Sequence, residues 1–197
     1  MRIGQEAEVT SGSARKSSAA TPRARSRFRR MSDDAGPALH VVLVEPLIPQ
    51  NTGTIGRLCV AAGAKLHLVG PLGFDLDDSR RRRAGLDYWP SLDWENHPDL
   101  ASFLSAAAPP IERSWYTTTR AGRPYGEAPF RRGDWLFFGK ETVGLPQDLW
   151  EDHTDRCLTI PMRPAARSIN LAIAVGIVAY EALRQTGWPA GGAAEFS

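Results

Sequence analysis

Short apolar runs rich in β-branched and aromatic residues alternate along this chain with longer segments in which apolar residues recur every three or four positions. The first pattern is typical of buried strands and the second of helices that pack on one face. The predicted strands span residues 39–44, 65–69, 113–118, 135–138 and 157–160, and the predicted helices span residues 51–62, 79–86, 98–107 and 168–185. This alternation predicts an α/β fold with a mainly parallel sheet flanked by helices.

The two ends of the chain differ in composition from its middle. The first 30 residues contain eight basic and two acidic groups, and no apolar periodicity extends through residues 1–37, so we expect a disordered basic tail there. There are three alternative interpretations of this tail. It could be a transit peptide or a basic arm that contacts RNA, or the natural protein could start at Met31. Residues 38–187 are expected to form one domain, and residues 188–197 a frayed C-terminus.

Composition excludes several classes of protein. The net charge of +2 comes from the tail, so it does not argue for a nucleic-acid partner. Cys59 and Cys157 are far apart and form no CxxC pair, which excludes a disulfide scaffold and predicts buried thiols in a cytoplasmic protein. The longest apolar run, residues 171–180, is about half as long as a membrane span, so we expect no membrane segment.

Common cofactor motifs are missing. The chain contains neither a P-loop nor a GxGxxG turn with an acidic partner, which argues against nucleoside triphosphates and nicotinamide cofactors. Its histidines are scattered, without the spacing of a metal-binding pair, so we expect no metal. His40 and His67 alternate within strands and are expected to lie in the core or at its rim.

Three segments that leave predicted strands are rich in Gly, Pro and polar residues. They are residues 45–57, 139–146 and 161–170. In a parallel sheet such segments meet at the carboxyl ends of the strands, where ligands bind. Each one alone is best interpreted as a turn, but the three together predict a pocket for a small molecule.

The same three segments carry a specific resemblance. They read VEPLIPQNTGTIGRLC, FGKETVGLP and IPMRPAARSINLAIAVGIVAYEALRQ. In this order, with GPLGF and DDSRRRRAGLDY between the first two, they resemble the SPOUT superfamily of methyltransferases, most closely the TrmL-type tRNA (cytidine/uridine-34) 2′-O-methyltransferases. The resemblance implies a C-terminal trefoil knot, a bound S-adenosylmethionine (AdoMet), a tRNA substrate and a homodimer whose active site uses both subunits.

The resemblance also implies which residues bind the cofactor. These are Thr117, Gly139, Ile160 and Ser168. Several of these positions act through their backbone, so the side chains of Thr117 and Ile160 are expected to matter little. A simpler interpretation of Ser168 is the N-cap of the last helix.

Arg57 stands at the motif position that related 2′-O-methyltransferases use in catalysis. A ribose 2′-hydroxyl must lose its proton as it attacks a sulfonium methyl group, so a nearby group must accept the proton or stabilise the developing charge. Because a guanidinium stays protonated, we favour Arg57 as an electrostatic stabiliser and phosphate anchor over a role as base.

A further set of residues is expected to contact the RNA. They are Asn51, Arg80, Arg82, Arg83, Arg167 and Tyr180. Asn51 is expected first to order its loop, and through it to reach the ribose or the partner subunit. The consecutive arginines suggest a patch for the tRNA backbone, since phosphate contacts supply most of the affinity. For Tyr180, packing of the last helix is an equally good interpretation.

Two other functions stay open from the sequence. One is 2′-O-methylation of ribosomal or another RNA, and the other is a noncatalytic RNA-binding dimer that kept the fold. The first 37 residues are too short and too polar for an additional RNA-binding domain, which favours the tRNA enzyme.

Overall fold

The computed structural model describes residues 36–75 and 88–188. Within these residues, six strands form one sheet in the order β3-β2-β1-β5-β4-β6, and every pair of neighbours is parallel. The strands are β1 (Leu39–Val44), β2 (Lys65–Val69), β3 (Trp94–His97), β4 (Ser114–Thr117), β5 (Asp134–Phe138) and β6 (Cys157–Leu158). The predicted α/β fold with a mainly parallel sheet is therefore confirmed.

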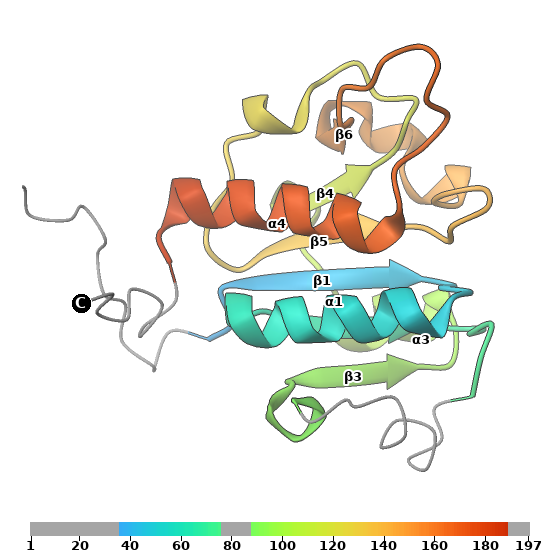
Figure 1. The fold of residues 1–197 in the computed structure, drawn as a ribbon, viewed down its shortest axis with the longest axis vertical. Coiled ribbons are helices and arrows are strands. Elements are labelled where there is room, and N and C mark those ends of the chain that lie inside the picture. The colour runs from blue at the N-terminus through green and yellow to red at the C-terminus, as the bar shows by residue number, and fades with distance from the viewer. Residues whose placement is uncertain (1–35, 76–87, 189–197) are drawn as a thin grey trace, which may run out of the picture.

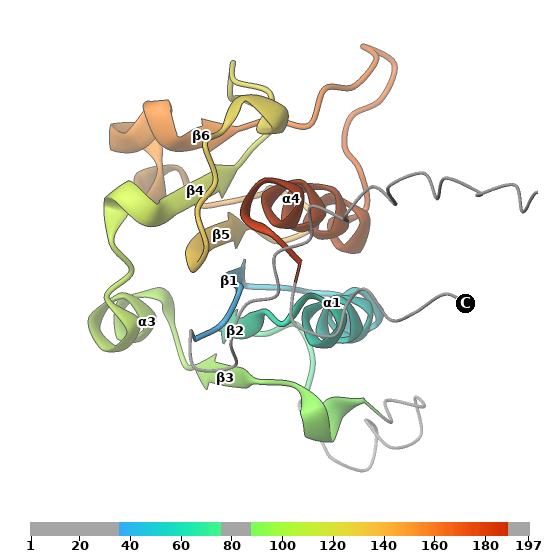
Figure 2. The same ribbon diagram turned by 90° about the vertical axis from the view of Figure 1, so that its left-hand side faces the viewer.

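Helices cover both faces of this sheet. The α-helices are α1 (Pro49–Ala62), α3 (Leu100–Ala107) and α4 (Leu171–Thr186). Short 3-10 helices are η1 (Trp89–Ser91), η2 (Ile111–Arg113), η3 (Tyr125–Glu127), η4 (Gln147–Leu149) and η5 (Glu151–Arg156). Figure 1 shows α1 and α4 side by side on one face, and the turned view in Figure 2 shows α3 on the other.

The core has two layers because the central strands are buried on both faces. Ile55 and Cys59 of α1 pack with Val175 of α4 on one face of the sheet. On the opposite face, Phe103 of α3 packs on Phe137 of β5. This double burial explains why the central strands read as continuous apolar runs rather than as alternating ones.

The first residues of α1 and α4 differ from the predicted ones, because the residues at each helix N-terminus determine where the helix begins. Helix α1 begins at Pro49, two residues earlier than predicted, since a proline needs no hydrogen-bond acceptor in the first turn. Helix α4 begins at Leu171, because the Asn170 side chain accepts hydrogen bonds from the backbone N–H groups of Ala172 and Ile173. The interpretation of Ser168 as the N-cap of this helix is therefore wrong.

Strand β3 is absent from the prediction. It reads Trp-Glu-Asn-His and lies at the sheet edge, where its two central side chains are exposed. An edge strand of this kind needs no apolar run, so the pattern that reveals buried strands is missing. The helix that follows, α3, begins after Asp99, whose carboxylate accepts a hydrogen bond from the Ser102 backbone N–H at 2.7 Å.

Some expectations lie outside the described residues. These are most of the basic tail, the helix at residues 79–86, the arginines Arg80, Arg82 and Arg83, and the C-terminal segment after residue 188. Both cysteines are buried, as predicted, and burial raises the pKa of each thiol. No described helix is both long and apolar enough to cross a bilayer. The trefoil knot stays a prediction, since strand order alone does not test how the chain is threaded.

Candidate active site

A cavity of about 760 Å³ lies where β4, β5 and β6 end. Its walls come from residues 117–120, 139–147 and 167–171, from Ile48 and Asn51 in the segment after β1, and from Trp150, Thr159, Ile160, Met162 and Ala174. All three turn-rich segments therefore contribute, as the sequence predicts. The volume is in the range of cavities that hold cofactors and other small molecules.

The structure brings together the residues that the resemblance assigns to the cofactor. All four line the cavity: Thr117, Gly139, Ile160 and Ser168. Two of the proposed RNA contacts, Asn51 and Arg167, line it as well. Residues separated by up to 117 positions thus share one cavity because their strands are neighbours in the sheet.

Gly139 begins a tight turn at the end of β5. The turn is closed by a bridge between Lys140 and Gly144, in which the Gly144 N–H donates to the Lys140 carbonyl at 2.9 Å. A Cβ atom on residue 139 would overlap the backbone of Gly144 and Leu145. The turn therefore requires glycine at this position, whatever the cavity binds.

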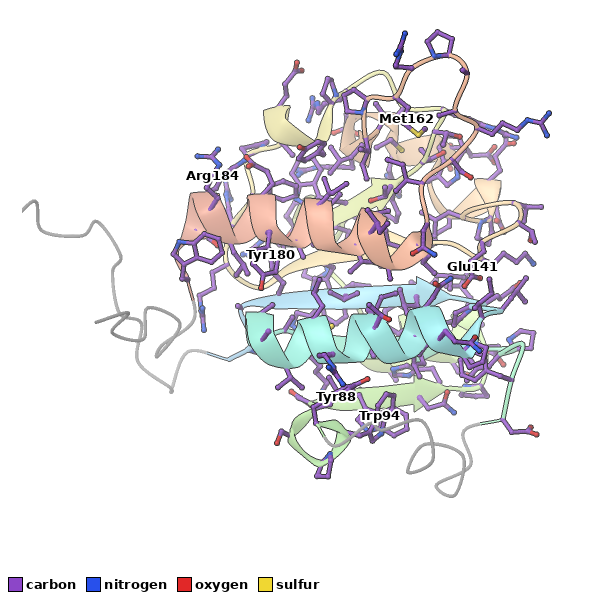
Figure 3. All side chains as sticks on the ribbon, viewed as in Figure 1. Tyr88, Trp94, Glu141, Met162, Tyr180 and Arg184 are labelled. Carbon is purple, nitrogen blue, oxygen red and sulfur yellow. The ribbon has the colours of Figure 1, made fainter. Side chains whose placement is uncertain are left out.

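Glu141, in the same turn, connects it to the start of α1. Its carboxylate accepts hydrogen bonds from the backbone N–H groups of Leu47 at 2.9 Å and Ile48 at 3.2 Å, and from the Asn51 side chain at 2.9 Å. The N-cap residue Ile48 has no side chain that can cap the helix, so Glu141 supplies the negative charge at this N-terminus. Figure 3 shows Glu141 at the end of the sheet where α1 and α4 begin.

Asn51 extends this connection to the third segment. Its side-chain oxygen accepts a hydrogen bond from the Asn170 amide at 2.9 Å, and Asn170 in turn caps α4. The chain Glu141–Asn51–Asn170 thus joins all three segments that line the cavity. Its members order the loops, while contact of Asn51 with RNA stays a prediction.

The hydrogen bonds also affect the charge of Glu141. Partial burial opposes ionisation, but the bonds from Asn51 and from the backbone of Leu47 and Ile48 outweigh it and hold the pKa of Glu141 below its ordinary value of 4.5. A carboxyl whose pKa is lower in the folded state stabilises the fold above the unfolded pKa, and this contribution is lost as the pH falls through the folded pKa.

Replacing Glu141 by Gln is expected to lower the free energy of unfolding near pH 7 by about 1–3 kcal/mol. The amide lacks the charge and has one acceptor oxygen in place of two, so one backbone N–H at the start of α1 loses its partner. Urea denaturation measures the loss. Glu112→Gln, at an exposed position, is the matched control and should leave stability unchanged. Equal stability of Glu141→Gln and wild type at pH 7 would contradict the capping role.

Two buried polar atoms on the cavity wall are compatible with a ligand. The Thr117 Oγ1 and the Trp150 Nε1 are buried, and within the described ranges neither has a hydrogen-bond partner. Unsatisfied buried groups are rare in folded proteins unless a ligand or water completes them. Trp150 was not predicted, because it lies beyond the second motif and nothing in its sequence surroundings indicates a cavity.

The cavity wall is basic. Arg120, Lys140 and Arg167 line it, and Glu141 is the one acidic residue among the described lining residues. Lys140 forms an ion pair with Glu45, which has a left-handed backbone (φ 51°) directly after β1. The two remaining arginines give the cavity a positive edge, suited to phosphate or carboxylate groups.

Arg57 lies elsewhere. It is exposed on α1, with its guanidinium 4.9 Å from the centre of the Tyr88 ring, and is not among the described residues that line the cavity of its own chain. Figure 3 shows Tyr88 on the side of α1 away from α4. Its catalytic role stays a prediction.

Tyr180 also lies away from the cavity. It is exposed on α4, and its ring is 5.6 Å from that of Trp188. Ile173, two turns earlier, is exposed too, so both side chains lie on one outer face of the helix. Val175 and Val178 of the same helix are fully buried in the core, whereas Leu171 and Ala174 line the cavity.

A parallel sheet with a basic small-molecule cavity at the carboxyl ends of its strands defines an α/β ligand-binding protein. The model of one family, the SpoU rRNA Methylase family, matches residues 38–180. The chain belongs to this family.

Relatives and solved structures agree with this assignment. A tRNA (cytidine(34)-2′-O)-methyltransferase of Burkholderia ambifaria is 46% identical over 153 residues, which are 77% of this chain and 98% of the relative. A solved structure described as giving insights into the 2-OH methylation of C/U34 on tRNA is 47% identical, with a TM-score of 0.68 over 76% of this chain and 92% of its own. An AdoMet-bound rRNA methyltransferase of Sinorhizobium meliloti is 29% identical, with a TM-score of 0.65 over 77% of this chain and 59% of its own.

Proposed function

We propose that the protein is an AdoMet-dependent tRNA 2′-O-methyltransferase that methylates the ribose of the wobble nucleotide, cytidine or uridine 34. The observation that carries the proposal is the convergence of Thr117, Gly139, Ile160 and Ser168 on one cavity. The relatives that match the chain over almost their full length support the choice of tRNA.

The residues present fit AdoMet. Gly139 lets the backbone approach the ligand closely, and the buried Thr117 hydroxyl and Trp150 indole N–H provide polar partners. Arg120 and Arg167 are suited to a carboxylate or phosphate. When bound, AdoMet supplies an electrophilic methyl group on a positively charged sulfur.

The chain's own contribution to the reaction is positioning and charge stabilisation. A ribose hydroxyl is a weak nucleophile, and a cation beside the oxygen stabilises the negative charge that develops as its proton leaves. Arg57 is the candidate for this cation. Because Arg57 does not line the cavity of its own chain, we propose that it acts on the cavity of a partner subunit in a homodimer.

The outer face of α4 supports a homodimer. Ile173 and Tyr180 are 57% and 42% exposed, which is costly for apolar side chains two turns apart on one helix face. Arg57 is exposed on the neighbouring helix α1. A second copy packed along these helices would cover the apolar side chains and bring Arg57 near a second cavity.

Ribosomal RNA is the second candidate substrate. The family description and the Sinorhizobium meliloti relative favour it. That relative, however, is only 29% identical and this chain covers 59% of it, whereas the tRNA relative is 46% identical and covered to 98%. We therefore favour tRNA, with the protein acting in the cytoplasm, where tRNA is modified.

Nucleoside mapping tests the proposal. The purified protein is incubated with AdoMet and tRNA from cells that lack the protein, and parallel reactions contain ribosomal RNA. We expect 2′-O-methylation at nucleotide 34 by mass spectrometry, and none in ribosomal RNA. Methylation confined to ribosomal RNA would show that ribosomal RNA, and not tRNA, is the substrate. Binding of tRNA without any methylation would indicate a noncatalytic protein.

A further inference from the structure

Three ligand-type atoms meet on the face of the sheet covered by α3, outside the cavity. The His67 Nδ1 and the His97 Nε2 are 3.3 Å apart. The Glu95 Oε2 lies 3.8 Å from the first and 3.7 Å from the second. His67 comes from β2, and Glu95 and His97 come from β3, the edge strand that the sequence did not reveal.

This spacing fits a metal ion. The point equidistant from three atoms so spaced lies about 2.1 Å from each, which is the length of a zinc–nitrogen or zinc–oxygen bond. Two imidazoles and one carboxylate are ligands that zinc accepts, while magnesium and calcium prefer oxygen atoms alone. A tetrahedral site completed by water needs its ligand atoms about 3.4 Å apart. The two ring nitrogens already have this spacing, and the half-exposed Glu95 carboxylate reaches it by moving a few tenths of an ångström toward the rings.

The outer partners of these side chains hold them in the orientation that metal binding needs. The other ring nitrogen of His67, Nε2, is hydrogen-bonded to the His40 Nδ1 at 3.0 Å, which leaves the His67 Nδ1 toward the site. The Lys65 ammonium donates to the Glu95 Oε1 at 2.7 Å, which leaves Oε2 toward both rings. Such second partners fix ring tautomer and carboxylate orientation in metal sites.

The surroundings make the site rigid on one side and accessible on the other. His67 is 2% exposed, and its ring contacts the edge of the Phe103 ring of α3 at 5.6 Å between centroids. His97 is also buried and packs edge-on against Phe103 at 5.0 Å. The Glu95 side chain is 50% exposed, so an ion can enter from solvent along it.

We propose that His67, Glu95 and His97 form a zinc site that ties the edge strand β3 to β2. Zinc takes the position between the two rings and replaces the hydrogen bond that joins them. Its role is structural, because the site lies on the opposite half of the sheet from the cavity walls formed after β4, β5 and β6. The sequence contains no spacing typical of a metal site, because the two histidine ligands come from β2 and β3 and lie 30 positions apart in the chain.

Calorimetry and metal analysis test this site on the untagged full-length protein after chelator treatment. We expect one zinc ion bound per chain, no binding of magnesium at the same concentration, and the visible absorption of a tetrahedral site with cobalt(II). Zinc should also raise the thermal unfolding midpoint, since it binds only the folded state. Failure to bind zinc at one ion per chain would overturn the proposal.

Variants distinguish this site from binding elsewhere. Glu95→Gln and His97→Gln should weaken zinc binding at least about tenfold and abolish the rise in unfolding midpoint. His153→Gln, a histidine outside the cluster, should bind zinc like wild type. Because Glu95 is half exposed, its variant is expected to fold even where a change at the buried His67 would not. Unchanged zinc affinity in both variants would overturn the proposal.

Discussion

Arg57→Ala is expected to lower kcat for tRNA methylation by about 10²–10³-fold, the effect of removing one group that stabilises a developing negative charge. AdoMet affinity should stay within about twofold of wild type, because Arg57 does not line the cavity of its own chain. Single-turnover methylation measures the first quantity and calorimetry the second. Arg57→Lys keeps the positive charge but lacks the planar guanidinium, so its kcat should lie between those of wild type and Arg57→Ala. Full activity of Arg57→Ala would exclude it as the catalytic cation.

Mixing two inactive variants tests whether Arg57 acts across subunits. Arg57→Ala chains are combined with Gly139→Ala chains, which carry Arg57 but a defective cavity. In mixed dimers the intact cavity of the first chain meets the intact Arg57 of the second. If half the dimers are mixed and each has one good site, activity should recover to about a quarter of wild type. If subunit exchange is demonstrated and methylation activity does not recover, Arg57 acts on the cavity of its own chain.

Gly139→Ala is expected to weaken AdoMet binding at least about 100-fold and to lower the free energy of unfolding by about 1–3 kcal/mol. The added Cβ would overlap the backbone of Gly144 and Leu145, so the turn must open and the wall of the cavity must move. The adjacent Glu141 would be displaced with it, which loosens the start of α1. Calorimetry with AdoMet measures the affinity, and urea denaturation measures the stability.

Gly126→Ala is the matched control for this change. A Cβ at Gly126 meets no atom within 4 Å, and the residue lies in η3, outside the cavity wall. It should bind AdoMet like wild type. If Gly139→Ala binds AdoMet as tightly as Gly126→Ala, the turn is not part of the binding site, and the assignment of the cavity to AdoMet loses its main support.

Among the site residues, those in strand-end motifs were predictable and those that act through distant partners were not. The resemblance assigned Thr117, Gly139 and Ile160 to the cofactor, and all three lie at or just after the ends of predicted strands, where a parallel sheet brings residues together. Glu141 is different, because its role depends on Leu47, a residue 94 positions away. Nothing local distinguishes its carboxylate from an exposed surface charge.

Apolar periodicity is a local property of the chain, and it was enough to determine the α/β class and five of the six described strands. Gly- and Pro-rich composition, which is also local, indicated the three segments that line the cavity. Only the tertiary structure decided that Glu141 caps α1, that the polar β3 pairs at the sheet edge, and that Trp150 lines the cavity. Only the tertiary structure, too, brought His67, Glu95 and His97 together. The physical reason is that hydrogen bonds and ligand sets join atoms by distance in space, whereas a sequence pattern records distance along the chain.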